Sequence, residues 1–311
     1  MNLFLSSAPH VHSPQTTRVL MRNVLIALAP CAGAAIWYFG YSALILMAIA
    51  TATAVFAELI WQKLTGQKVR IDDLSAAVTG LLVGLNLPPQ APWWLAVIGS
   101  LFAIIIVKCL FGGLGDNFMN PALAARGVLL ASWPVRMTSW VLPTGWNSYA
   151  DAVTGATPLA SPGSFTLKDL LLGNIPGTMG EVCKVAILVG LLFLLVTKTI
   201  SWRIPVCVVA TTFVFSWLFG NDPVVSILSG GLLFAAVFMA TDYVTCPMTD
   251  KGQYIYAVGV GLLIAVIRNF GNYPEGATYA ILLMNIATPL IDRFTKNRVY
   301  GHERKVKKEN G

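Results

Sequence analysis

Long apolar stretches without charges recur along the whole 311-residue chain, and they constrain its fold more than any other feature. They fall at about 24–39, 42–62, 74–88, 93–110, 121–133, 181–197, 204–219, 224–241, 254–267 and 276–292. With 56% hydrophobic and 11% charged residues, the chain has too little polar surface for a soluble domain. The sequence therefore predicts an all-α polytopic membrane protein with about ten transmembrane helices.

Two of the stretches, 74–88 and 121–133, are shorter than the roughly 20 residues that a full crossing needs. Pro and Asn residues lie at their ends, in LNLPPQAP and in NFMNPALAARG. These features predict broken or re-entrant helices, which are tolerated where protein or a cavity satisfies the freed backbone groups.

The distribution of Lys and Arg predicts the orientation. If all ten stretches cross, sixteen of the 21 Lys and Arg residues, Lys108 among them, fall on the side of the basic tail. Basic loops stay in the cytoplasm, so both termini are expected there. The predicted organisation is a cytoplasmic segment 1–23, a five-helix unit 24–133, an extracytoplasmic loop 134–180, a second five-helix unit 181–292 and a basic tail 293–311.

Five stretches in each half predict two inverted repeats, related by an axis in the membrane plane. The third stretches of the two halves, AAVTGLLVGLNLPP (76–89) and SILSGGLLFAAVFMATD (226–242), are weakly similar. This arrangement predicts a site near the midplane, where the broken helices meet.

The remaining composition narrows the function. Much of the net charge of +7 lies in the tail, where it favours contact with anionic lipid over nucleic acid. The five cysteines are scattered singly and no GxGxxG occurs, so no local metal site, iron–sulfur motif or catalytic residue is predicted. The alternative that one cysteine meets the cysteines of a partner subunit across an interface is kept open.

The longest polar loop contains a run with the spacing of a modification site. DAVTGAT, from Asp151 to Thr157, fits D-x-x-[ST]-G-A-[ST], the acceptor motif for transferases that attach FMN through its phosphate. Thr157 would supply the hydroxyl oxygen, and Asp151 would help the transferase to hold its metal and phosphate. Gly155 and Ala156 would let that enzyme close over the backbone, with Thr154 at the remaining motif position. An ordinary surface turn is the alternative.

These motifs together resemble a known family. GGLGDNFMNPALAARG (112–127), DAVTGATPLA (151–160), MATDYVTCPMT (239–249) and IRNFGNYPEGATYAILLMNIATPLIDR (267–293) are similar to segments of the D subunits of Rnf (Rsx) complexes. Those complexes are ion-translocating ferredoxin:NAD oxidoreductases, and their D subunits are homologous to the B subunit of the sodium-translocating NADH:quinone reductase. The resemblance covers nearly the whole chain. Tyr243 and Cys246 depart from the common Pro and Ser.

The resemblance implies a urea-transporter-like fold and a flavin-carrying electron-transfer subunit of the bacterial cytoplasmic membrane. It implies covalent FMN on Thr157, a flavin transferase during maturation, and the Rnf subunits A, B, C, E and G as partners. Turnover would require the whole complex, which couples electron flow between ferredoxin and NAD to Na⁺ or H⁺ translocation.

Other polar residues are candidates with structural alternatives. By resemblance, Asn117 and Asn120 imply a non-covalent riboflavin, whereas a helix cap is the alternative for Asn120. Arg126 is expected to face a flavin phosphate or to pair with a partner helix. Glu58 is interpreted as structural, and Asp242 is expected to cap the next segment through Thr245.

Two other functions are kept open. One is a component of the quinone reductase itself, and the other is a urea-transporter-like channel without a redox role. Most tryptophans fit an interfacial belt, while Trp146 lies near Thr157 in the sequence and could stack on a flavin.

Overall fold

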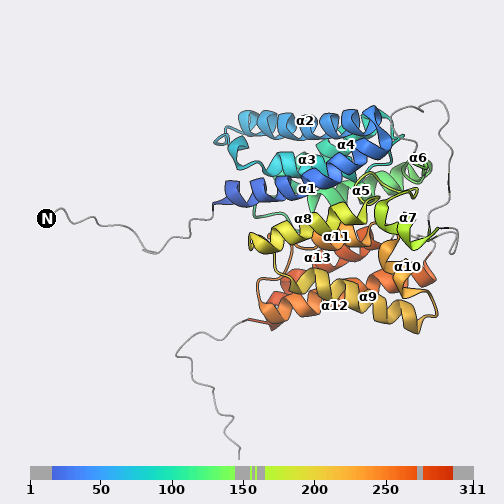
Figure 1. The fold of residues 1–311 in the computed structure, drawn as a ribbon. Coiled ribbons are helices and arrows are strands. Elements are labelled where there is room, and N and C mark those ends of the chain that lie inside the picture. The colour runs from blue at the N-terminus through green and yellow to red at the C-terminus, as the bar shows by residue number, and fades with distance from the viewer. Residues whose placement is uncertain (1–15, 144–154, 156–157, 160–164, 272–275, 297–311) are drawn as a thin grey trace, which may run out of the picture.

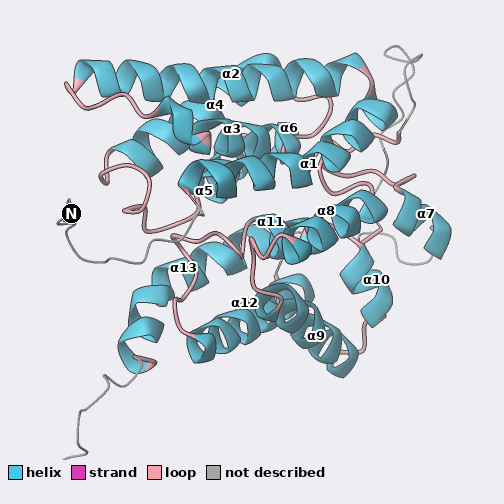
Figure 2. Cartoon of the chain, turned by 60° about the vertical axis from the view of Figure 1, so that its left-hand side comes forward, coloured by secondary structure: helices cyan, strands magenta, loops and turns pink. Residues whose placement is uncertain are grey.

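The computed structural model describes residues 16–143, 155, 158–159, 165–271 and 276–296. Within these ranges the chain consists of helices joined by turns and loops, and no β-strand element forms there (Figure 2). The ribbon shows the helices stacked side by side, with α2 along one edge and α9 and α12 along the opposite edge (Figure 1).

The helices fall into two groups along the chain. The first contains α1 (Thr17–Phe39), α2 (Tyr41–Leu64), the short 3₁₀-helix η1 (Ile71–Asp73), α3 (Ser75–Leu85), α4 (Trp93–Leu101), the π-helix η2 (Phe102–Cys109) and α5 (Pro121–Ser132). The second contains α8 (Lys184–Val196), α9 (Arg203–Leu218), α10 (Pro223–Leu228), α11 (Leu232–Phe238), α12 (Asp250–Phe270) and α13 (Ala277–Phe294). The short helices α6 (Pro134–Met137) and α7 (Leu167–Leu172) lie between them.

Every apolar stretch of the sequence forms helix, with two corrections to the expected bounds. The first helix begins at Thr17 and not at residue 24, because the Thr16 hydroxyl accepts a hydrogen bond from the Val19 amide and caps it. The stretch 224–241 is two helices, α10 and α11. The chain breaks between them at Gly230, whose φ of +64° favours glycine.

The outer surface of the helices is apolar, and small residues face the interior. In α2, Ala43, Ala50 and Ala54 are buried, whereas Ile45 and Phe56 are exposed. Large exposed apolar surfaces of this kind are typical of proteins in lipid. Among the described residues, three helices, α1, α2 and α12, are long and apolar enough to cross a membrane by length and composition. The protein is a mostly helical membrane protein, and crossing by all ten stretches stays a prediction.

Two glycines set the close contact between α2 and α3. An added Cβ at Gly80 would lie 2.6 Å from Thr51 Cα and 2.8 Å from Ala50 O. One turn later, an added Cβ at Gly84 would lie 2.9 Å from Met47 Cα. The spacing Gly80-x-x-x-Gly84 lets the two backbones touch, as small residues do in membrane helix pairs.

The two groups of helices meet along their first and last members. Helix α1 packs against α8, and α5 packs against α13. The segment before α8 also completes the end of α3, because Met179 N donates to Leu87 O at 3.2 Å and Gly180 N donates to Leu85 O at 2.8 Å. Backbone groups freed at the end of the short helix α3 are thus satisfied by the segment that leads into the second group of helices.

Both terminal helices reach the same side of the molecule. The start of α1 and the end of α13 lie at the left in Figure 1, whereas α6, α7 and α10 lie at the right. The described part of the segment between the two groups is therefore on the side away from both chain ends.

Candidate functional site

Short helices from the two groups, α3, α5 and α11, meet at a buried polar cluster. Asn86 follows α3, and its Nδ2 donates to Leu82 O at 2.7 Å and lies 3.8 Å from Met239 Sδ. Met239 follows α11, and its carbonyl accepts from Asn120 Nδ2 at 3.4 Å. The ends of the third stretches of both halves therefore converge on Asn86 and Met239.

Arg126 belongs to this cluster. It is only 6% exposed, and its Nη1 donates to Asn86 Oδ1 at 2.8 Å. An added Cβ at Gly231 would lie 4.0 Å from Arg126 Nη1 and 2.8 Å from Glu181 Oε2. Glu181 is buried, and its Oε1 accepts from Thr178 N at 2.9 Å. Arg126 thus contacts Asn86 at the end of α3, and its expected roles toward a flavin phosphate or a partner helix stay predictions.

Asn120 is the N-cap of α5, as the structural alternative predicts. Its Oδ1 accepts from Ala122 N at 3.0 Å and from Leu123 N at 3.2 Å, with Pro121 at the first helical position. This arrangement satisfies two of the amides that every helix start leaves unpaired.

A small internal cavity lies beside the two asparagines. Asn117, Asn120, Asp242 and Lys108 are among the residues that line its volume of about 70 Å³. Pockets for drug-sized ligands hold about 300–1,000 Å³, so this space does not fit a flavin ring. A riboflavin at Asn117 and Asn120 therefore rests on the resemblance alone. Thr245 Oγ1 donates to Asp242 Oδ2 at 3.2 Å, whereas the next helix, α12, is capped by Thr249.

The cap gives a direct test of this interpretation. We expect Asn120→Ala to lower the stability of the protein by about 1 kcal/mol, because two buried amides lose their acceptor. Asn120→Ser keeps an acceptor oxygen and should stay close to wild type. Thermal unfolding of the purified protein in detergent measures both variants, and equal loss in the two would contradict the capping role.

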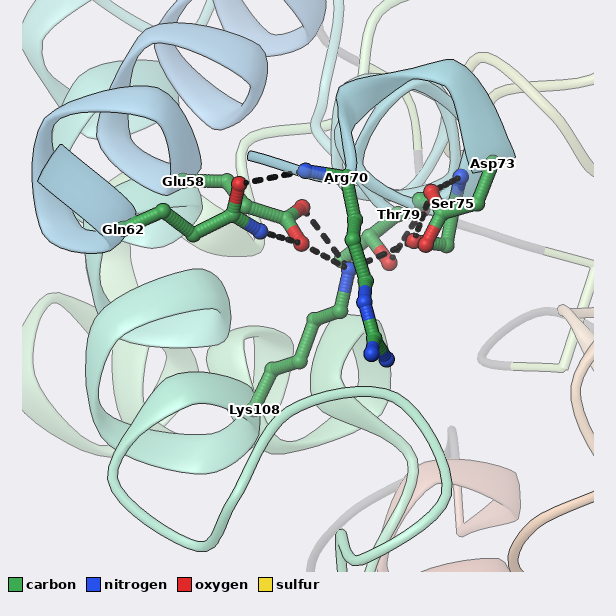
Figure 3. Close-up of polar contacts among 7 residues, drawn as sticks. All are labelled: Glu58, Gln62, Arg70, Asp73, Ser75, Thr79 and Lys108. Atoms are coloured by element: carbon green, nitrogen blue, oxygen red, sulfur yellow. Dashed lines mark hydrogen bonds and ion pairs between the residues drawn. The ribbon is translucent and has the colours of Figure 1, made fainter. Parts of the chain in front are cut away.

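A second buried cluster carries full charges (Figure 3). Lys108 Nζ, from η2, lies 2.9 Å from Glu58 Oε1 and 2.8 Å from Glu58 Oε2, from α2. It also donates to Ser75 Oγ, at the start of α3, at 2.6 Å. Lys108 is 1% exposed and Glu58 is 3% exposed. Three oxygens thus satisfy all three protons of the ammonium, which is the condition for a tolerable buried charge.

Neighbouring side chains hold this charged cluster in place. Gln62 Nε2 donates to Glu58 Oε1 at 3.1 Å, while Gln62 Oε1 accepts from Arg70 N at 2.9 Å. Asp73 Oδ1 accepts from Ser75 Oγ at 2.6 Å. Glu58 and Asp73 line a cavity of about 500 Å³ on one side, and Lys108 and Ser75 line the small internal cavity on the other. The charged cluster is therefore the wall between the two cavities.

Sequence reasoning missed the role of Lys108. The orientation argument counts it only as a charge on the side of the basic tail, whereas its side chain is buried and binds Glu58. Fifty residues separate the two positions, so no helical spacing connects them. The sequence does hold one signal for this role. Lys108 is the only charged residue in the apolar run FAIIIVKCLF (102–111), and a single charge in such a run indicates a buried partner.

The acceptor motif lies mostly outside the described residues. Asp151, Thr154, Ala156 and Thr157 fall there, as does Trp146. The residues that flank Thr157 are described. Gly155 N donates to Trp140 O at 3.1 Å, Pro158 is buried, and Leu159 is half-buried.

A cavity of about 470 Å³ lies beside Pro158 and Leu159, and we name it the outer cavity. Its other walls come from α9, α10 and α12, through Ser216, Gly220, Asn221, Asp222, Val225, Ser226, Ala265, Arg268 and Asn269. Because α10 and the ends of α9 and α12 lie at the right in Figure 1, the outer cavity is on the side away from both chain ends.

Hydrogen bonds order the polar walls of the outer cavity. Arg268 donates to the carbonyl of Ser226, within α10, and to the carbonyl of Ser229, directly after it. Asn221 Nδ2 donates to Asn269 Oδ1 at 3.0 Å. Fixed polar groups around a space of this size are typical of a site for a small molecule.

The apolar helical architecture defines an integral membrane protein with buried polar clusters between its two halves. The chain belongs to the NQR2, RnfD, RnfE family, whose model matches residues 4–301. It is 50% identical to the D subunit of the Na(+)-translocating ferredoxin:NAD(+) oxidoreductase complex of Acetobacterium woodii, over 99% of this chain and 98% of that protein.

The similarity to two further relatives supports this family membership. The D subunit of the proton-translocating ferredoxin:NAD(+) oxidoreductase complex of Clostridium ljungdahlii is 41% identical, over 97% of this chain and 98% of that protein. The D subunit of the ion-translocating oxidoreductase complex of Halorhodospira halophila is 37% identical, over 96% of each. These relatives are subunits of redox-driven ion translocases, and their names differ in the ion.

Proposed function

We propose that this chain is a flavin-carrying electron-transfer subunit, with FMN esterified through its phosphate to Thr157. The observation that carries the proposal is the seven-residue run from Asp151 to Thr157, which matches the acceptor motif at each constrained position. The membership of the chain in the NQR2, RnfD, RnfE family supports the same function.

The surroundings of the motif support this proposal. Gly155 is tied to Trp140 by a backbone hydrogen bond, and Pro158 packs into the protein. Pro158 and Leu159 line the outer cavity, whose walls from α9, α10 and α12 lie on the side away from both chain ends (Figure 1). We take that side to be extracytoplasmic, because basic residues gather on the other side. A bacterial flavin transferase of this type acts there.

Each part of the site has a distinct task in this proposal. FMN, when bound, supplies the redox chemistry. The chain supplies the hydroxyl that retains the phosphate, the fixed backbone on either side of it, and the electrostatic surroundings. The chain alone would have no turnover, since its electron donor and acceptor would belong to other proteins of the complex.

The proposal extends to the complex and to the arrangement in the membrane. By likeness to its relatives, the chain would work with subunits A, B, C, E and G of an Rnf-type complex in the bacterial cytoplasmic membrane. Electron flow between ferredoxin and NAD would be coupled there to Na⁺ or H⁺ translocation. The contacts of α1 with α8 and of α5 with α13 pair equivalent members of the two halves. They support two inverted five-helix repeats of the urea-transporter type.

Replacement of the acceptor hydroxyl tests the proposal. In a host that has the transferase, Thr157→Ala should abolish covalent FMN, because no oxygen remains to bond the phosphate. Thr157→Ser should retain it, and Thr138→Ala should not affect it. In-gel flavin fluorescence after denaturation and the intact mass of the protein measure the modification.

A wild-type protein with only its polypeptide mass in such a host would contradict the proposal. That outcome would favour a channel without a redox role, which has no need for an acceptor motif. The quinone-reductase alternative is separated by the substrate, since the proposed complex would transfer electrons between ferredoxin and NAD and would not require quinone.

A further inference from the structure

The cavity of about 500 Å³ beside the charged cluster lies on the side of both chain ends, and we name it the tail-side cavity. Thr17 lines it, and Thr17 is the first residue of α1, whose start lies on that side in Figure 1. Gln62 in α2, Arg70 before η1 and Gly113 after η2 also lie in its walls. Its volume is within the range of about 300–1,000 Å³ that small-molecule sites occupy.

The carboxylates in the wall of the tail-side cavity already have partners. Glu58 binds Lys108 through both oxygens, and the buried ammonium balances its charge. Asp73 Oδ1 accepts from Ser75 N at 2.8 Å and from Ser75 Oγ at 2.6 Å. A cation in the cavity would therefore compete with contacts that the chain already makes.

The basic side chains in the same wall are not engaged in this way. Lys68 and Arg70 line the cavity and are exposed, and within the described part of the chain no hydrogen bond or ion pair holds either side chain. In Figure 3 the guanidinium of Arg70 carries no dashed line. Since Lys108 balances Glu58, these two positive charges face the single negative charge of Asp73. The tail-side cavity is thus complementary to an anion, and a guanidinium is well suited to phosphate oxygens.

Hydrogen bonds fix the backbone that carries the two basic residues. Gln67 N donates to Gln62 O at 2.9 Å, and Arg70 N donates to Gln62 Oε1 at 2.9 Å. Gly66, with a φ of +65°, makes the turn that leads from α2 into this segment. The backbone of Lys68 and Arg70 is therefore ordered before a ligand binds, which lowers the entropic cost of binding.

Apolar side chains flank the tail-side cavity. Leu64 is exposed at the end of α2. Leu110 and Phe111 are exposed as well, and they lie between Cys109 and Gly112, which both line the cavity. Basic pockets between membrane helices bind the headgroups of anionic lipids. A basic cavity with an apolar border therefore fits an amphiphile better than a soluble anion.

We propose that the tail-side cavity binds the headgroup of an anionic phospholipid. The lipid phosphate would contact Arg70 and Lys68, and the acyl chains would lie against Leu64, Leu110 and Phe111. The bound headgroup would also cover the side of the charged cluster that faces this cavity. The site is separate from the acceptor motif, so the inference does not depend on the proposed function.

The test compares lipid binding by two double variants of the full chain. Lys68→Gln/Arg70→Gln removes both basic side chains from the cavity wall. Lys63→Gln/Lys251→Gln is the matched control, because it removes two exposed lysines that do not line the cavity. The native lipid is first removed in detergent. Native mass spectrometry then gives the apparent dissociation constants for phosphatidylglycerol and for phosphatidylcholine with the same acyl chains.

We expect wild type and the control to bind phosphatidylglycerol more tightly than phosphatidylcholine. In Lys68→Gln/Arg70→Gln, binding of phosphatidylglycerol should weaken about 30-fold, because each basic residue near anionic lipid contributes a factor of about five. Neither side chain makes a hydrogen bond within the described part of the chain, so this variant should unfold at the wild-type temperature when no lipid is added.

Three outcomes would overturn the inference. The first is equal binding of phosphatidylglycerol by wild type and Lys68→Gln/Arg70→Gln. The second is an equal loss in the control, which would assign the effect to the net charge of the surface. The third is displacement of phosphatidylglycerol from wild type by inorganic phosphate at the same concentration, which would identify the ligand as soluble phosphate.

Discussion

Replacement of Lys108 by Met is expected to lower the free energy of unfolding by about 3–5 kcal/mol, because it leaves a buried carboxylate without its partner. The ammonium satisfies both oxygens of Glu58 and the hydroxyl of Ser75 at 2.6–2.9 Å. Methionine fills a similar volume, so the loss would come from charge and not from a cavity. An ionised group alone at this depth is costly in protein and in lipid.

A second substitution tests whether the unpaired charge of Glu58 causes the loss of stability. Glu58→Gln removes the carboxylate charge, so Lys108→Met/Glu58→Gln should be more stable than Lys108→Met alone. Thermal or denaturant unfolding in detergent gives the four stabilities of the double-mutant cycle. If the double variant loses as much as the sum of the single variants, the pair is not coupled and the prediction is wrong.

Gly80→Leu is expected to disrupt the contact between α2 and α3, at a cost of about 3 kcal/mol or more. Even a Cβ would lie 2.6 Å from Thr51 Cα, and backbone atoms cannot turn away as side chains do. The helices would have to separate, which would also shift Ser75 at the start of α3. The amount of folded protein in membranes and its thermal midpoint measure the effect.

Gly33→Leu is the matched control for this prediction. Gly33 lies in α1, another apolar helix, and an added Cβ there meets nothing within 4 Å. The same glycine-to-leucine change should therefore leave the folded amount near wild type. Equal losses in Gly80→Leu and Gly33→Leu would show that the helix contact is not the cause.

The sequence predicts the helices well because lipid imposes a simple rule on them. Backbone groups cannot stay unpaired in hydrocarbon, so each long apolar run is expected to be helical, and each is. The caps are local as well. NP at Asn120 and Pro121 predicts the start of α5 because both residues act within one turn.

The polar clusters were harder to predict because they depend on contacts between distant segments. Arg126 reaches Asn86 across forty residues, and Lys108 reaches Glu58 across fifty. The break between α10 and α11 differs, because Ser229, Gly230 and Gly231 interrupt the apolar run and are a local turn signal. The acceptor motif does not depend on contacts between distant segments, because a modifying enzyme recognises it as a continuous stretch of sequence. The motif therefore predicts the modification site from the sequence alone. Thr157 lies outside the described residues, so this site stays a prediction.

The hydrogen bonds from Met179 and Gly180 to the carbonyls of Leu87 and Leu85 have a consequence for biogenesis. During synthesis, α3 enters the membrane long before its two donors leave the ribosome. Until they arrive, the carbonyls must be sheltered by water or by the insertion machinery. A half-chain that ends before Met179 would lack both donors, so the end of α3 is completed only when the segment that leads into the second group of helices is present.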